Sequence, residues 1–254
     1  MIRIIFVQLL LALLLISQVY AKSNEAKSKE SATFAEAAKN LTQGHYAEAI
    51  KLYTQEIKDN PNNSKAFNNR GLTYHKMGDF DKAIADYNTA IKLKPKDAHT
   101  YNNRGSAYNL KGNLDFAIAD FKKAISLDGK TSKYYYNLGN VEKRKGDLSS
   151  ALGDLNKALE LNPKYSNAYF SRGSIYQQQG QIDSAIGEFT KAIENNPQMP
   201  TAYNSRAVMY FLKKDYDKSW QDVQAAEKLG LKAHPDFLSS LKGAMGQDKT
   251  TATR

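Results

Sequence analysis

The chain has 254 residues, of which 41% are hydrophobic and 24% are charged, and its formal net charge at pH 7 is +10. These fractions are ordinary for a globular protein, so they exclude a disordered chain, a collagen-like fibre and a membrane protein with many spans. The absence of cysteine excludes disulfides, thiolate zinc sites, iron–sulfur clusters and cysteine nucleophiles.

Residues 1–21 have the pattern of a secretory signal peptide. Arg3 is their only charge, a largely apolar run of 13 residues follows from residue 4 to residue 16, and Val19 and Ala21 supply a small-residue cleavage site. The run is shorter than a membrane-spanning helix of about 20 residues. We therefore expect an exported protein, periplasmic or secreted, with an uncleaved N-terminal membrane anchor as the alternative. The polar residues 22–31 predict a short flexible leader.

The rest of the chain repeats one unit of 34 residues. Both large and small residues recur at this spacing, which is typical of a solenoid whose units bury their apolar faces only against their neighbours. The large series is Phe67, Tyr101, Tyr135, Tyr169 and Tyr203, and the small series is Gly71, Gly105, Gly139, Gly173 and Ala207.

Each unit contains two helical patterns. In the third unit, Tyr101, Gly105 and Tyr108 are three or four residues apart, which places them on one face of a first helix. A turn at residues 111–113 follows, and a second helix then repeats apolar residues from Ala117 onward. Glycines at the ends of the first helices suit a chain that must stop and turn there. They are Gly78, Gly112, Gly146 and Gly180.

These patterns resemble the tetratricopeptide repeat family. Residues 101–108 (YNNRGSAY) and 115–121 (DFAIADF) are similar to its aromatic-x-x-Leu-Gly-x-x-Tyr and Ala-x-x-x-Phe signatures, with arginine in place of leucine. The resemblance implies an all-α, right-handed superhelical solenoid whose first helices line its concave side. We expect six helix-turn-helix units over residues 32–233.

After the sixth unit, residues 234–245 predict a capping helix, and residues 246–254 predict a disordered tail. An apolar stripe supports the capping helix, although a helix that binds a partner is the alternative. The stripe consists of Phe237, Leu238, Leu241 and Met245.

Charged residues also keep the register. An arginine in a packed helical array needs a carboxylate or carbonyl partner, which predicts a repeated link between an arginine and an acidic residue 16 positions later. A ladder of anion-binding sites is the other interpretation. In the fourth unit Leu138 replaces the arginine, so Asp154 is expected to be less well satisfied. The two series are Arg70, Arg104, Arg172 and Arg206, and Asp86, Asp120, Asp154, Glu188 and Asp222.

The resemblance places a peptide-binding groove on the first helices, where side chains are not expected to be needed for packing. Asparagine amides both donate and accept hydrogen bonds, so a row of them could hold a peptide backbone, and basic and aromatic neighbours favour an extended or helical peptide with acidic character. A solvated face without a ligand is the alternative. The candidate residues are Asn69, Asn103, Asn137, Lys65, Lys133, Tyr136, Asn140, Lys143, Arg144 and Phe170.

No motif indicates an enzyme. None of the four histidines has metal-ligand spacing, no phosphate-binding loop occurs, and the carboxylates recur with the repeat. We expect no cofactor, metal, nucleic acid or small-molecule substrate. The prediction is a non-enzymatic protein–protein interaction scaffold of the cell envelope or secretory space. Its rival is a binder of an anionic cell-wall or membrane-surface polymer, and a self-associating array is a third possibility. The oligomeric state stays open.

Overall fold

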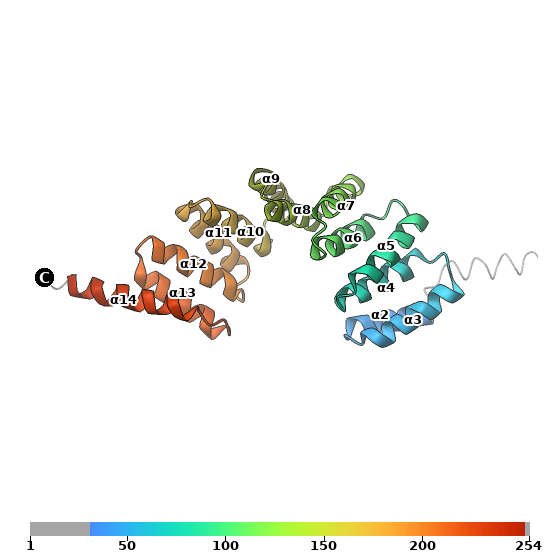
Figure 1. Cartoon of the computed structure of the whole chain (residues 1–254), viewed down its shortest axis with the longest axis horizontal. Helices are drawn as coiled ribbons and strands as arrows, with labels where there is room; N and C mark the ends of the chain where they lie inside the picture. The colour runs from blue at the N-terminus through green and yellow to red at the C-terminus, as the bar shows by residue number, and fades with distance from the viewer. Residues whose placement is uncertain (1–30, 252–254) are drawn as a thin grey trace, which may run out of the picture. The chain divides into compact units, whose positions relative to one another are not determined.

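A computed structural model describes residues 31–251, with side chains described as far as residue 246. The expected signal peptide and nearly all of the leader lie outside these residues. The described part of the chain forms helices and no strands (Figure 1), which confirms the predicted all-α solenoid of helical repeats. In chain order the helices are α2 (Ala32–Thr42), α3 (Tyr46–Asp59), α4 (Ser64–Lys76), α5 (Phe80–Leu93), α6 (Ala98–Leu110), α7 (Leu114–Leu127), α8 (Ser132–Lys145), α9 (Leu148–Leu161), α10 (Ser166–Gln178), α11 (Ile182–Asn195), α12 (Pro200–Leu212), α13 (Tyr216–Lys228) and α14 (Pro235–Thr251).

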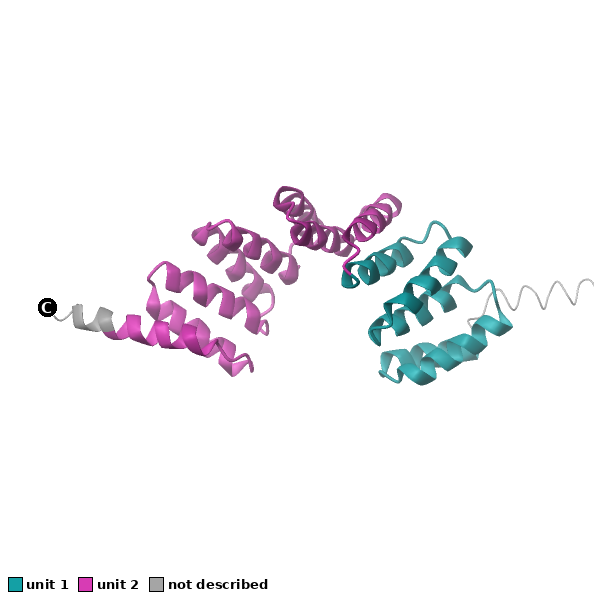
Figure 2. Ribbon diagram, viewed as in Figure 1, with its two compact units in different colours: residues 1–111 teal, residues 112–254 magenta. Residues whose placement is uncertain are grey.

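The helices divide between two compact units, residues 1–111 and residues 112–254 (Figure 2). Helices α2 to α6 belong to the first unit and α7 to α14 to the second. The boundary falls between the two helices of the third repeat. Within each unit, helices that follow one another in the chain pack together.

Local signals in the sequence fix where the helices begin and end. Asp79, Asp147 and Asp215 each accept a hydrogen bond from the backbone N–H three residues later, which satisfies a donor that the first turn leaves free. The glycines between paired helices have positive φ, which costs glycine little. In the sixth repeat Lys214 takes this position with φ 63°.

The core of each repeat depends on a small residue facing a large one 16 positions later. A Cβ added at Gly173 would lie 2.8 Å from the ring of buried Phe189, and one added at Gly71 would lie 2.9 Å from Tyr87. In the sixth repeat Ala207 occupies the glycine position, and the smaller Val223 stands opposite it in the same apolar cluster. The extra methyl group is therefore matched by a smaller partner.

Helix α14 packs on the last helix pair. Leu241 is fully buried in a cluster with Val223, and Phe237 meets Phe211 with ring centroids 5.5 Å apart. The helix continues to Thr251, so the first six residues of the tail expected from the sequence are helical. The apolar stripe that marked the helix in the sequence ends at Met245, and nothing in the pattern beyond it signalled the extension.

We predict that Gly173→Ala lowers the free energy of unfolding by about 1–3 kcal/mol, because the new methyl group overpacks the contact with Phe189. Gly187→Ala is the matched control: Gly187 is exposed on α11, and a Cβ there meets nothing within 4 Å. Replacing this glycine by alanine inside a helix should raise the free energy of unfolding by about 0.5–1 kcal/mol. Chemical denaturation measures both, and equal effects of the two variants would contradict the packing account.

Candidate protein-interaction surface

In the unit of residues 1–111, two of the predicted asparagines belong to a hydrogen-bonded cluster. Asn68 is its centre: its Nδ2 donates to Asn69 Oδ1 at 3.1 Å, and its Oδ1 accepts from Asn103 Nδ2 at 3.1 Å and from Thr100 Oγ1 at 3.3 Å. Asn69 Nδ2 also donates to the hydroxyl of buried Tyr53 at 3.3 Å. The cluster therefore links α3, α4 and α6.

This geometry corrects one expectation. Asn69 and Asn103 each use an amide donor inside the chain, so they contribute to packing between helices. Both are half-buried, and an amide has two donors and two lone pairs, which leaves capacity for a further partner. The predicted basic neighbour, Lys65, is exposed on α4.

In the unit of residues 112–254, three predicted residues follow one face of α8. Tyr136, Asn140 and Lys143 are spaced four and three apart, and all are half-buried. Asn140 Oδ1 accepts from Ser171 Oγ at 2.9 Å, which joins α8 to α10. The ring of Tyr136 packs against Tyr165 with centroids 4.9 Å apart. The face is therefore held in place by contacts with the next repeat.

Lys143 carries an unneutralised charge on this face. No carboxylate of the described residues lies within ion-pair distance of its ammonium group, and partial burial lowers its pKa. The ammonium group is thus partly desolvated, and no acidic partner among the described residues offsets that loss of hydration.

The remaining candidates lie on α8 and α10. Phe170 occupies on α10 the position that Tyr136 has on α8, and its ring lies 5.6 Å from that of buried Phe189. Asn137 is half-buried, whereas Lys133 and Arg144 are exposed. The structure therefore brings Tyr136, Asn140, Lys143 and Phe170 onto two neighbouring helices, which we call the α8/α10 face.

The predicted link between arginine and carboxylate is confirmed in three repeats. Each guanidinium also donates to a hydroxyl or amide oxygen on the second helix of the preceding repeat, and these pairs leave little for a ladder of anion sites. Arg70 binds Asp86 (2.7 and 2.8 Å) and Thr54 (3.0 Å), Arg172 binds Glu188 (2.7 Å) and Asn156 (2.6 Å), and Arg206 binds Asp222 (both 2.8 Å) and Thr190 (2.9 Å).

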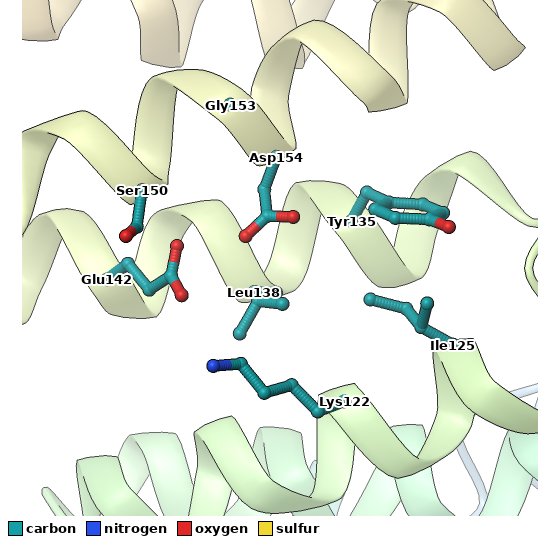
Figure 3. A pocket seen from close by; sticks show the side chains of 8 residues that line it. All are labelled: Lys122, Ile125, Tyr135, Leu138, Glu142, Ser150, Gly153 and Asp154. Carbon is teal, nitrogen blue, oxygen red and sulfur yellow. The ribbon is translucent and has the colours of Figure 1, made fainter.

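The fourth repeat has no such arginine, and a second carboxyl group stands there instead. Glu142 is buried beside half-buried Asp154, near Lys122 and Leu138 (Figure 3). Burial, followed by the hydrogen bond and negative charge of Asp154, raises the pKa of Glu142 to about 7. Burial also raises the pKa of Asp154. Asp154 thus has a carboxyl group beside it where three other repeats place a paired arginine.

Sequence reasoning missed Glu142, although the repeat contained a signal. Stepping by 34 residues from Glu142 reaches tyrosine in four other repeats, so the glutamate departs from the residue that most repeats have there. The tyrosines are Tyr74, Tyr108, Tyr176 and Tyr210.

Other kinds of site find no support in the described part of the chain. No group of three or more histidines and carboxylates there could hold a metal ion. Among the same residues, no helix combines the length and the apolar character that crossing a membrane requires.

Models of repeat families match most of the sequence. Models described as tetratricopeptide repeat match residues 64–97, 98–130 and 172–235, and a model described as TPR repeat matches residues 41–78 and 139–180. The chain belongs to the tetratricopeptide repeat family. None of these models is that of a catalytic family, and no curated protein matches the sequence.

Solved structures give the same assignment. MamA superposes with a TM-score of 0.58 at 30% identity, over 63% of this chain and 94% of MamA. YrrB, described as a TPR protein with an unusual peptide-binding site, superposes with a TM-score of 0.56 at 25% identity, over 78% of this chain and 97% of YrrB. PilF of Pseudomonas aeruginosa shares the fold at 18% identity, with a TM-score of 0.67 over 75% of this chain and 87% of its own. Protein–protein interaction is the general role that these likenesses support.

We predict that Glu142 contributes a fall in the free energy of unfolding as the pH rises from about 4.5 to about 7. In this window the folded chain keeps the proton of Glu142, whereas the unfolded chain releases it, so the folded state binds more protons. Glu142→Gln cannot ionise and should flatten the fall. Denaturant titrations at several pH values measure it.

Glu160→Gln is the control, because it removes an exposed carboxylate from the neighbouring helix α9. It should keep the pH dependence of the wild type. The assignment to Glu142 is wrong if Glu142→Gln and Glu160→Gln show the same curve.

Proposed function

We propose that this chain is an exported interaction scaffold that binds an extended, acidic peptide segment on the α8/α10 face. The observation that carries the proposal is Lys143, whose half-buried ammonium group has no acidic partner among the described residues. An acidic group of a ligand would supply that partner and recover the cost of desolvating the lysine.

The neighbours of Lys143 suit a peptide. Asn140 uses one amide hydrogen on a backbone oxygen within α8 and its oxygen on Ser171, so a second amide hydrogen remains for a peptide carbonyl. Tyr136 and Phe170 offer half-buried rings beside it, which favour apolar or aromatic side chains of the ligand. Exposed Lys133 and Arg144 would attract acidic residues at longer range.

The face is held rigidly before any ligand arrives. Its residues lie on helices, and the contacts of Asn140 with Ser171 and of Tyr136 with Tyr165 tie α8 to the elements that follow it. A preformed surface loses little conformational entropy on binding, so its contacts count more fully toward affinity. The peptide-binding site described for YrrB, at 25% identity, lends support to a peptide as ligand.

Export remains a proposal from residues 1–21, which lie outside the described part of the chain. It would place the scaffold in the periplasm or outside the cell, where the partner is an envelope or secreted protein. The net charge of +10 would favour partners with acidic surfaces.

The test starts from a phage-displayed library of twelve-residue peptides, whose best binder is synthesised with a fluorescent label. We predict that Lys143→Ala weakens its binding by at least about tenfold, as expected for a contact that carries more than 1 kcal/mol. Lys228→Ala removes one exposed positive charge from α13 and should change binding less than twofold. Fluorescence anisotropy measures the affinities, and circular dichroism checks that both variants fold.

The proposal fails if Lys143→Ala and Lys228→Ala bind the peptide equally well. Salt then separates the rival interpretation. Binding to an anionic polymer such as heparin should fall steeply with ionic strength and respond equally to both lysines, whereas a groove contact should survive better in salt.

A further inference from the structure

The carboxyl pair of the fourth repeat lines an open hollow of about 430 Å³ between α7, α8 and α9. All three helices belong to the unit of residues 112–254. Figure 3 shows the side chains of Glu142 and Asp154 directed toward the same space, with Leu138 below them and Lys122 at the opposite edge.

In other repeats the guanidinium of an arginine occupies the corresponding space. It binds a carboxylate on the second helix of its own repeat and a side-chain oxygen on the second helix of the preceding repeat. It also lies over the ring of the aromatic residue three positions earlier, at 5.8 Å for Arg70 over Phe67 and 5.6 Å for Arg172 over Tyr169. The repeat therefore builds a guanidinium site with an acidic wall and an aromatic floor.

The fourth repeat keeps that site but lacks its arginine. Asp154 and Tyr135 are the expected acidic and aromatic residues, and both line the hollow. The aliphatic side chain of Leu138 has neither a charge nor a hydrogen-bond donor to offer the carboxylate. Two further positions change with it: Glu142 stands where four other repeats have tyrosine, and Lys122 stands where four other repeats have threonine or asparagine.

The acidic groups are left without a contacting cation. Glu142 is 6% exposed; apart from the hydrogen bond that its carboxyl group shares with Asp154, its buried Oε2 accepts none. Lys122 is close enough for its charge to favour ionisation of both carboxyls, yet it makes no ion pair with either of them. A buried carboxyl oxygen without a partner is costly, so a group that fills the hollow and donates to it would be stabilised.

We propose that this hollow is a receptor site for an arginine side chain of a partner polypeptide, whose guanidinium takes the place that the chain's own arginines take in the other repeats. The site lies on α8 opposite the α8/α10 face, since Leu138 and Glu142 are two positions away from Tyr136 and Asn140 on a helix. It is therefore a second contact, independent of the acidic-peptide site.

The chemistry selects a guanidinium over other cations. Two carboxyl groups beside a lysine are too few ligands for a metal ion, and no third histidine or carboxylate of the described residues joins them. A guanidinium is planar and weakly hydrated, donates to two carboxyls at once and stacks on an aromatic ring such as Tyr135. A compact ammonium group is more strongly hydrated and cannot stack on the ring as a plane.

Binding should also depend on pH. The charged and titratable groups that face the hollow are Lys122 on α7, Tyr135 and Glu142 on α8 and Asp154 on α9, with Asp147 just before α9 acting on Glu142. An ionised Glu142 attracts a guanidinium more strongly than a protonated one. Affinity should therefore rise with pH through about 7, with release of the glutamic proton on binding.

The test uses two probes on the full chain: ethylguanidinium, and a capped pentapeptide with a central arginine between glycines. The same pentapeptide with citrulline is the neutral control. Nuclear magnetic resonance of ¹³C-labelled glutamate and aspartate carboxyls reports binding at Glu142 and Asp154. We expect both arginine-like probes to shift these signals, and the citrulline peptide to bind at least tenfold more weakly.

Leu138→Arg supplies the missing side chain from within and is expected to fold, because it restores the residue of four other repeats. It should abolish probe binding. Arg172→Ala is the positive control: it empties the guanidinium position beside Glu188, and ethylguanidinium should shift the signal of that carboxyl.

Each other outcome overturns the proposal. Equal binding of the arginine probes to the wild type and to Leu138→Arg would mean that the hollow is not the site. Equal binding of the citrulline peptide would mean that charge plays no part. Binding of ethylguanidinium without the pentapeptide would assign the hollow to a small guanidinium compound. No binding to the wild type, with a response from Arg172→Ala, would mean that Lys122 satisfies the carboxyls within the chain.

Discussion

The architecture depends on the close approach of two helices at one small residue in each repeat. A Cβ at Gly71 or Gly173 would come within 3 Å of the ring that faces it, so the pair can pack only while one side stays small. Dense packing makes such contacts unforgiving. The sixth repeat meets the same constraint differently, with Ala207, larger than glycine, opposite Val223, smaller than the aromatic ring. Matching of volume across the helix pair is thus the constraint that the repeat preserves.

This approach brings a second, polar layer into register. With the helices held close, the position one residue before the glycine lies beside the carboxylate 16 positions later, and an arginine there is paired on both sides. Such pairs cost desolvation and repay it by charge-assisted hydrogen bonds, so removal of one partner leaves the other buried and unsatisfied. The fourth repeat shows this consequence within the native chain. Leu138 stands in place of the arginine, and the pKa values of the Glu142 and Asp154 carboxyl groups are raised.

Much of this could be predicted from the sequence, because it follows from periodicity. The 34-residue register gave the helix pairs, the turns and the arginine links, since each rests on contacts within a repeat or between neighbours. The side-chain network around Asn68 could not be predicted, because asparagines on one face read alike whether they bind each other or a ligand. Glu142 could not be predicted for a related reason: periodicity points to residues that recur, whereas this glutamate departs from the tyrosine that recurs at its position.

The two proposed contacts differ in charge and in face. The α8/α10 face offers a cation, Lys143, to an acidic ligand, and the hollow of the fourth repeat offers carboxyls to a basic one. A partner that carries both kinds of residue could engage the fourth repeat from both sides of α8.

The measurement that tests the central claim most directly is the pKa of Glu142 in the wild type and in Leu138→Arg, from ¹³C resonances of the carboxyl group. The account predicts a value of about 7 in the wild type and a clearly lower value once an arginine fills the hollow. The same raised value in both proteins would contradict it, because a guanidinium bound between the two carboxyl groups must lower the pKa of Glu142.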